Sequence, residues 1–450
     1  MYIESISIEN LKSISKLRWD LAGRRPEGWH VILGDNGSGK TSFLRGICLA
    51  LLGPINADPL IPLWSSYVRN EQSSAICDVV VRRDLQFDKY LLDNAGEEME
   101  GVLGEDTANV QTNIVTPKSD TIQWPFGIEI GKLTARPNAA YQKRRTGRNL
   151  SDNVKCWFSA AYGPFRRFTG GDREEEERLL SRPVVGRHMS VFAERVALSQ
   201  PIEWLIGLHT EQLDTGKQSE LLKDVIAFVN QDGFLPYGVR FDRVTSKDVL
   251  FTDAGGVTVR IEDLSDGYRS VLCMTLELIR QLSLSYGQVE IFDKNGAIII
   301  AVPGVVLIDE VDVHLHPSWQ RTIGLWYRKH FPKIQFIVTT HSPLVCQAAD
   351  HGTVYSLPDP ETGGEGGFVE GAMLDRLLYG NILEAYSTDL FGDAVTRSDA
   401  SEEKLDRLAS LNVKALRGRL TPSERAEREH LQRIFASSPS ILEDDLRGAA

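Results

Sequence analysis

The stretch at 34–41 reads Gly-Asp-Asn-Gly-Ser-Gly-Lys-Thr and constrains this chain more than any other, because it matches the phosphate-loop pattern G-x-x-x-x-G-K-[ST]. The apolar run 29–33 precedes it and an amphipathic stretch follows to Leu51, which predicts a strand, a loop and a helix. Glycines let such a loop lie close to a triphosphate, so that backbone N–H groups and the helix N-terminus face the anion. The sequence therefore predicts a nucleotide site.

Within this loop, Lys40 is expected to reach the β- and γ-phosphates, and the Thr41 hydroxyl is expected to ligate Mg²⁺. The predicted cofactors are ATP and Mg²⁺. The residues expected to contact the nucleotide are Asn36, Gly37, Ser38, Gly39, Lys40, Thr41 and Ser42.

Length and composition place the chain among ordinary globular proteins. Its 450 residues are enough for two or three lobes, and 42% hydrophobic and 25% charged residues are typical of a soluble protein. The net charge of −12 argues against a uniformly basic nucleic-acid binder, although a local basic face is still compatible with it. We find no signal-like N-terminus and no apolar run of membrane-spanning length, so we expect a cytoplasmic protein without a membrane partner. Five cysteines without Cys-x-x-Cys spacing are expected to be reduced and structural: Cys48, Cys77, Cys156, Cys273 and Cys346.

A first lobe is expected at 1–170. Alternating apolar and polar residues predict strands at 3–8 and 17–21, and Gly53 before a proline should end the helix that starts near Lys40. A strand pair is expected at 75–82 and 87–92, followed by an insertion of irregular structure at 93–150.

Two features of this lobe have two interpretations each. A basic cluster near the end of the insertion would either contact nucleic-acid phosphates or form a solvated loop; it consists of Lys143, Arg144, Arg145 and Arg148. The apolar segment 156–161 predicts a buried strand that turns at 162–164 toward Arg166 and Arg167. An arginine at this strand end would either contact the nucleotide or belong to a structural ion pair.

The rest of the chain divides into three further segments. Two helical patterns split near Gly216 predict a helical segment at 171–248, with no sustained heptads for a long coiled coil. A second lobe at 249–360 should contain a helix after Leu264 and strands at 249–252, 257–261, 297–308 and 335–338. Residues 361–450 are expected to be helical. The predicted fold is α/β: a mixed sheet flanked by helices, with a helical insertion and a helical C-terminal region.

Acidic residues follow the apolar segment that ends at Ile308. An apolar strand ending in Asp309 and Glu310 places both acids at the carboxyl edge of a parallel sheet, beside the phosphate loop. Asp309 is expected to hold Mg²⁺ together with Thr41, and Glu310 to orient and deprotonate the attacking water. His341 follows the next strand and is expected to reach the γ-phosphate or that water. The pair His314 and His316 is too small a set for a zinc site.

The stretch 264–269 reads Leu-Ser-Asp-Gly-Tyr-Arg and opens a helix. Ser265 and Gly267 at a helix N-terminus form a second anion-binding device, because free N–H groups and the helix dipole point outward. One chain already has a phosphate loop. A second anion site therefore predicts a head-to-tail dimer in which Ser265 meets the other subunit's γ-phosphate.

The order of these motifs, ending in Thr-Thr-His-Ser-Pro at 339–343, resembles the ABC-type ATPase heads of the SMC, RecF and OLD group. Within that group it is most similar to the stand-alone AAA-family ATPases of bacterial anti-phage systems, including the Septu and retron-associated ATPases. The resemblance covers 1–92 and 155–360 and implies a P-loop NTPase fold of the ABC-head type.

The resemblance also implies roles for single residues. It makes 34–41 the Walker A motif, Ser265 and Gly267 part of the ABC signature, and Asp309 and Glu310 the Walker B acid and the base. The remaining implied positions are Asp312 as the acid of the D-loop, His341 as the switch histidine, Lys12 as an N-terminal basic residue and Arg69 as a loop arginine.

The sequence departs from the pattern of the group at the Q-loop glutamine, for which Gln123 and Gln142 are candidates. OLD-type relatives append a TOPRIM nuclease domain. The stretch 368–371 resembles only the first motif of that domain, so we expect no built-in nuclease. The C-terminal stretches 377–383 and 423–435 resemble those of the defence-system relatives and favour a docking tail for a partner protein.

The leading hypothesis is a dimeric, or higher oligomeric, ATP-dependent switch that regulates an associated effector nuclease of HNH or TOPRIM type in anti-phage defence. The alternative is a DNA-repair or chromosome-maintenance ATPase that binds DNA directly. The basic cluster at 143–148 favours this alternative. A nucleotide-binding subunit of a transporter is disfavoured by the Ser-Asp-Gly-Tyr-Arg variant of the signature.

Overall fold

The computed structural model describes residues 1–61, 64–70, 72, 74–82, 84, 87, 89–90, 107–109, 116–118, 121–129, 154–155, 158–172, 174, 176, 182–193, 196–287, 291–360, 366–381, 385–386, 390 and 399–435. The chain divides into two units, Met1–Ile382 and Leu383–Ala450. Each unit is described by itself.

A six-stranded sheet forms the centre of the first unit. Its order is β10-β16-β17-β3-β18-β19, in which neighbours from β10 to β18 are parallel and β19 is antiparallel to β18. Every residue of β3, β16 and β17 is buried, as expected for parallel strands covered on both faces. The strands are β10 (Ser159–Tyr162), β16 (Gly304–Ile308), β17 (Ile334–Thr339), β3 (Gly28–Leu33), β18 (Gly352–Ser356) and β19 (Gly367–Phe368).

An antiparallel sheet accompanies it, with order β2-β1-β4-β8. The predicted strands at 3–8, 17–21 and 75–82 are confirmed as β1 (Tyr2–Leu11), β2 (Ile14–Asp20) and β4 (Ser74–Arg82). The expected pairing of 75–82 with 87–92 is wrong: β4 pairs with β1 and β8 (Thr121–Glu129), while β5 (Lys89–Tyr90) pairs with β9 (Val154–Lys155).

The insertion at 93–150, expected to be irregular, contains strands among its described residues. Apolar residues alternate at Ile122, Trp124, Phe126 and Ile128 within β8, and this period of two is typical of a strand. Pro125 and Gly127 obscure the pattern in the sequence. A short hairpin, β6 (Thr107–Asn109) with β7 (Thr116–Lys118), lies in the same insertion.

The helix after the phosphate loop, α1 (Lys40–Ala57), keeps its label to Ala57, but Gly53 has φ 69° and ψ 169°, so helical geometry breaks where the sequence predicts. The two middle helices are confirmed as α6 (Gln200–Thr215) and α7 (Glu220–Val229), with Gly216 in the left-handed region between them. The helix after Leu264 is α8 (Asp266–Tyr286), and α9 (Pro317–His330) follows β16.

The segment 171–248 is not helical throughout, because it ends in β11 (Arg240–Val244). This strand joins β12 (Val249–Thr252) and β13 (Thr258–Arg260) in a three-stranded sheet. The Asn230 side chain at the end of α7 bonds both the N–H and the C=O of Phe241, at 2.8 Å each, which fixes the strand against the helix.

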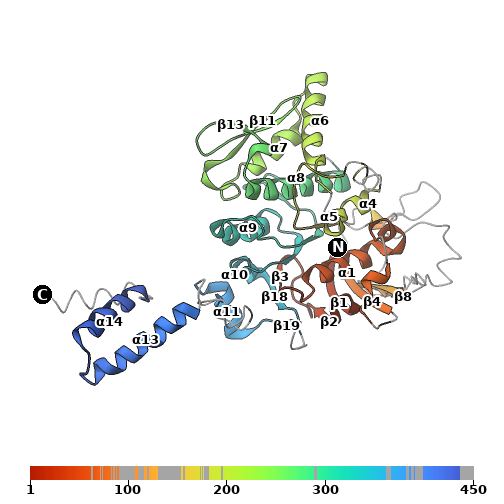
Figure 1. Ribbon diagram of the computed structural model, residues 1–450. Helices are drawn as coiled ribbons and strands as arrows, with labels where there is room; N and C mark the ends of the chain where they lie inside the picture. Colours follow the sequence, from red (N-terminus) through yellow and green to blue (C-terminus); the bar gives the residue numbers. More distant parts are fainter. Residues whose placement is uncertain are drawn as a thin grey trace. The chain divides into compact units, whose positions relative to one another are not determined.

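Figure 1 shows α6, α7 and this small sheet on one side of α8, with α9 on the other side. Residues 270–283 of α8 are buried all round for this reason. The remaining elements are α4 (Pro183–Gly186), α5 (Met189–Phe192), β14 (Phe292–Asp293), β15 (Ile299–Ile300), α10 (Pro343–Cys346) and α11 (Gly371–Tyr379).

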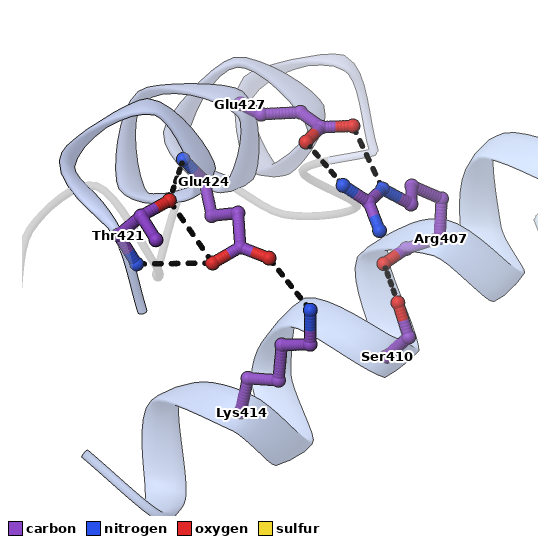
Figure 2. A network of polar contacts seen from close by, with 6 residues as sticks. All are labelled: Arg407, Ser410, Lys414, Thr421, Glu424 and Glu427. Atoms are coloured by element: carbon purple, nitrogen blue, oxygen red, sulfur yellow. Dashed lines mark hydrogen bonds and ion pairs between the residues drawn. The ribbon is translucent and has the colours of Figure 1, made fainter. Parts of the chain in front are cut away.

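The second unit contains a helical hairpin of α13 (Asp399–Leu416) and α14 (Pro422–Ile434), as predicted for the C-terminal region. Its buried core consists of Leu408, Leu411 and Leu431. Figure 2 shows the polar contacts across the hairpin: Arg407 pairs with Glu427, and Lys414 pairs with Glu424, which also completes a capping box with Thr421. No helix in the described part of either unit is long and apolar enough to cross a membrane.

Candidate functional site

The phosphate loop lies at the carboxyl edge of the central sheet, between β3 and α1. Because β10, β16, β17 and β3 are parallel, the loops that follow them meet at this same edge. Gly37 and Gly39 have φ of 86° and 100°, which L side chains rarely adopt. A Cβ on Gly39 would lie 2.7 Å from Ser13 Oγ and 2.8 Å from Ile14 Cγ1, so the loop needs glycine there for space as well.

Two polar side chains of the loop suit a phosphate group. Lys40 Nζ donates to the carbonyl oxygens of Gly34 at 2.7 Å and Asp35 at 3.0 Å, so the ammonium lies over the loop. Burial lowers the pKa of Lys40, while the nearby carboxylates of Glu310 and Asp309 act in the opposite direction. The buried Ser38 Oγ has no hydrogen-bond partner among the residues that the structure describes. Phosphate oxygens are the acceptors that both groups would take, so these residues fit a nucleotide.

The predicted metal ligands are in direct contact across 268 positions of sequence. Thr41 Oγ1 donates to Asp309 Oδ2 at 2.7 Å. Thr339 Oγ1 donates to the other oxygen, Asp309 Oδ1, at 2.6 Å. A hydroxyl and a carboxylate held in this way are the protein ligands that Mg²⁺ takes in phosphoryl-transfer sites.

The predicted base, Glu310, has a constrained backbone with φ 46°, in the left-handed region. Its N–H donates to Thr339 Oγ1 at 2.8 Å, and its C=O accepts from Arg166 Nη2 at 2.9 Å. The peptide groups on both sides of the Glu310 Cα are therefore fixed.

His341 is exposed and lies two residues after the end of β17. Desolvation of the ring lowers its pKa, and the positive charge of Lys40 lowers it further, while the carboxylates of Asp312 and Glu310 act in the opposite direction. The flanking residues are fixed: Thr340 Oγ1 donates to Asp312, and Ser342 Oγ donates to Gln320 Oε1 at 2.7 Å. The loop after β17 thus holds His341 beside the phosphate loop.

The second predicted anion site opens α8. Ser265 is exposed at the N-cap, and its side chain makes no capping hydrogen bond, unlike an ordinary N-cap serine. Gly267 packs so closely on the loop after β16 that a Cβ there would lie 2.7 Å from the His314 carbonyl oxygen. His316 caps α9 by accepting from the Ser318 N–H. Within the described ranges, no cluster of three or more metal-binding side chains is present.

Lys12 and Arg69 both lie beside the phosphate loop. The Lys12 ammonium is 4.2 Å from the centre of the Tyr67 ring, and Arg69 donates to the carbonyl of Ser13. Ser13 is the residue whose Oγ would meet a Cβ on Gly39. The structure therefore brings two basic side chains to the N-terminal strand turn next to the loop.

Arg166 forms no ion pair with any residue that the structure describes, so the interpretation as a structural ion pair is wrong, whereas the nucleotide contact stays a prediction. Its hydrogen bonds to described residues go to neutral oxygens: Ser270 Oγ, and the carbonyls of Gly163, Asp309 and Glu310.

The Q-loop candidates gain no support. Gln123 lies in β8, in the antiparallel sheet, and Gln142 lies outside the described residues, as do the basic cluster at 143–148 and Cys156. The segment that follows β10 at the site edge is 163–167, which contains no glutamine. Thr339 and Ser270 are the contacts that sequence reasoning missed; only the threonine carried a signal, as a polar residue at the end of a buried strand.

Two segments of the chain match known families. Residues 5–124 match the family described as "AAA domain", and residues 210–347 match "AAA domain, putative AbiEii toxin, Type IV TA system".

Relatives at moderate identity come from defence systems. The chain is 26% identical to Septu protein PtuA of Bacillus mycoides over 366 residues, which are 80% of this chain and 41% of that protein. It is 32% identical to the retron Ec83 probable ATPase of Escherichia coli over 165 residues, which are 34% of this chain and 29% of that protein. The chain thus spans less than half of either relative. Among solved structures, the SMC head domain from Thermotoga maritima is 14% identical with a TM-score of 0.39, covering 82% of this chain and 99% of that chain.

Proposed function

We propose, from the premise that this chain has a P-loop ATPase fold and is related to the Septu and retron ATPases, that two copies of it bind and hydrolyse ATP at sites which they share. The observation that carries the proposal is the network Thr41, Asp309, Thr339 and Glu310. It joins the phosphate loop to the acids after β16 by direct hydrogen bonds of 2.6–2.8 Å.

Each residue of the network has a task in hydrolysis. Thr41 and Asp309 would hold Mg²⁺, which supplies positive charge to the β- and γ-phosphates. Lys40, once it leaves the carbonyls of Gly34 and Asp35, is long enough to contact the same phosphates. Glu310 orients and deprotonates water, and His341 offers a hydrogen bond to the γ-phosphate or the water.

The second copy completes the site. Ser265 is exposed, and its side chain makes no capping hydrogen bond to the first N–H groups of α8, so this serine is available to an anion from another copy. In a two-fold dimer this half-site would take the γ-phosphate held by the other copy.

The test is ATP turnover by the purified chain with Mg²⁺. Glu310→Gln keeps the shape and removes the base, so we expect ATP to bind with turnover reduced about 10²-fold or more. Glu220→Gln is the matched control, because Glu220 pairs with Lys223 at the surface of α7. Equal turnover in both variants would contradict the assignment of Glu310.

The defence relatives lead to a finer proposal: ATP-dependent closure of the dimer regulates an effector nuclease encoded beside the chain, of HNH or TOPRIM type, which docks on the C-terminal hairpin. The hairpin exposes apolar side chains that its own small core does not use: Val413 is 47%, Leu416 is 90% and Ile434 is 50% exposed.

Co-expression with the neighbouring nuclease tests this docking. We expect Leu416→Glu to lose the nuclease on purification, and Leu213→Glu, at another exposed leucine on α6 (61%), to retain it. Loss from both variants or from neither would contradict docking on the hairpin. Salt-dependent binding of DNA by the chain alone would favour the alternative function in DNA repair.

A further inference from the structure

Arg166 is a buried cation without an acidic partner at hydrogen-bond distance in the described part of the chain. It is 5% exposed, and its hydrogen bonds go to four neutral oxygens. Removing a guanidinium from water is costly unless its donors are satisfied, and neutral acceptors compensate less than a carboxylate does. A leucine or methionine at position 166 would avoid this desolvation penalty. The stability of the fold alone therefore does not account for a hydrogen-bonded arginine here.

These hydrogen bonds join three segments. Nε donates to Ser270 Oγ on α8 at 2.9 Å, and Nη1 donates to Gly163 O after β10 at 3.1 Å. Nη1 also donates to Asp309 O at 2.8 Å, and Nη2 donates to Glu310 O at 2.9 Å. The planar fork of arginine fixes the relative positions of these acceptors, which a single ammonium group cannot do.

The helix end of this link is the signature half-site. Ser270 lies on the same helix as Ser265, and α8 is a continuous helix of 21 residues that is buried from 270 to 283. A shift at the Ser265 end therefore moves Ser270 with it, since a packed helix moves as a rigid element. Gly267 packs tightly against the His314 carbonyl, so the start of α8 and the loop after β16 cannot move closer together.

We propose that Arg166 is a positioning residue that couples the two half-sites of one chain: when the signature end of α8 engages the nucleotide of the other copy, the Arg166 fork sets the backbone, and so the carboxylate, of Glu310. This inference rests on the proposed function. It explains the strained φ of 46° at Glu310, whose carbonyl Arg166 holds while Thr339 holds its N–H. It also gives the segment after β10 a role at the edge of the sheet that carries the site.

Ser270→Ala tests the coupling, because it removes one contact of the fork and leaves Arg166 in place. We expect turnover per site to fall about tenfold while the Kd for ATP changes less than about twofold. The rate should also lose its cooperative dependence on ATP concentration and become hyperbolic, since each site no longer senses the other.

Ser283→Ala is the matched control. Ser283 is also buried on α8, but its hydroxyl donates to Arg280 O within the helix. A structural role alone would lower the thermal stability of both variants and leave the ATP dependence of both unchanged. Arg166→Lys keeps the charge without the fork and should behave like Ser270→Ala.

The outcomes are distinguishable. If the wild-type chain does not hydrolyse ATP, the proposed function fails and this inference falls with it. If the wild type hydrolyses ATP cooperatively and Ser270→Ala matches Ser283→Ala in rate and cooperativity, the coupling through Arg166 is refuted while the ATPase stands. A wild type with hyperbolic kinetics refutes the coupling as well.

Discussion

Thr339 makes two hydrogen bonds at the site through one hydroxyl. Its Oγ1 donates to Asp309 Oδ1 at 2.6 Å and accepts from the Glu310 N–H at 2.8 Å, and its side chain is fully buried. Thr339→Val replaces the hydroxyl with a methyl group of the same size and keeps a residue type that suits a strand. The change thus removes both hydrogen bonds and little else.

The two losses can be estimated separately. A hydrogen bond to a charged group contributes about 1.5–3 kcal/mol, and a buried N–H left without an acceptor costs about 1–3 kcal/mol. Because the two share one hydroxyl they are not additive, and we expect the free energy of unfolding to fall by about 3 kcal/mol.

The effect on catalysis follows from the backbone of Glu310. Its left-handed conformation costs roughly 1–3 kcal/mol, and the Thr339 hydroxyl is one of the contacts that hold it. Once released, the peptide relaxes and the carboxylate leaves its place. Because a positioned base contributes about 10²–10⁴ in rate, we expect turnover to fall about 10- to 100-fold.

The control is Thr353→Val, in β18 of the same sheet. Thr353 is also a buried threonine, and its Oγ1 lies 3.0 Å from His30 Nδ1, away from the acids. Urea unfolding and steady-state ATP turnover are measured for both variants. Both should lose stability, and only Thr339→Val should lose turnover. A Thr339→Val enzyme with turnover equal to that of Thr353→Val would refute the reasoning.

Three further outcomes are expected. Gly39→Ala should lose ATP binding measured by calorimetry, because its Cβ at φ 100° would meet Ser13 Oγ at 2.7 Å; unchanged affinity would contradict the close approach. Burial lowers the pKa of His30 to about 4. The His30 ring therefore stays neutral in the folded state, while in the unfolded state it takes up a proton below about pH 6.5. Stability should therefore fall by about 1.4 kcal/mol per pH unit from that pH down to about 4, and a His30→Gln variant should show a flatter urea-unfolding profile. Leu411→Ala, at a fully buried site of the hairpin core, should cost about 2–5 kcal/mol and make the hairpin sensitive to protease while ATP turnover persists.

Local pattern was enough to predict the part of the fold that carries the site. The glycine spacing at 34–41 and the acids after a fully apolar strand placed β3, α1 and β16 correctly, because their hydrophobic runs and turn residues have one physical solution. Gly53 and Gly216 likewise marked the ends of helical geometry, since both adopt positive φ.

The partners of the strands were harder to predict from the sequence than the strands themselves. The segment 75–82 reads as a strand, but nothing in it indicates that its partner is β8, about 45 residues away, rather than the nearer apolar run. The apolar alternation of β8 is interrupted on its polar positions by Pro125 and Gly127, which lower strand propensity.

The hydrogen-bond partners of Arg166 could not be predicted from the sequence either. Two arginines in a row at a strand end predict an anion or an acidic partner, because those are the usual partners of a guanidinium. The structure instead directs Arg166 to carbonyls of Asp309 and Glu310, 143 and 144 positions away. Backbone carbonyls occur at every residue and leave no mark in a sequence, so such contacts cannot be read from it.

The most direct test of the central claim, that two copies share each ATP site, is the molar mass in solution with ATP and Mg²⁺, measured by light scattering. Glu310→Gln, which should bind ATP without turning it over, is expected to form a dimer. The double variant with Ser265→Arg is expected to bind ATP and remain monomeric, because arginine at the exposed start of α8 blocks the partner's nucleotide. A double variant that dimerises as readily as Glu310→Gln, or a Glu310→Gln chain that stays monomeric with bound ATP, would contradict the shared site.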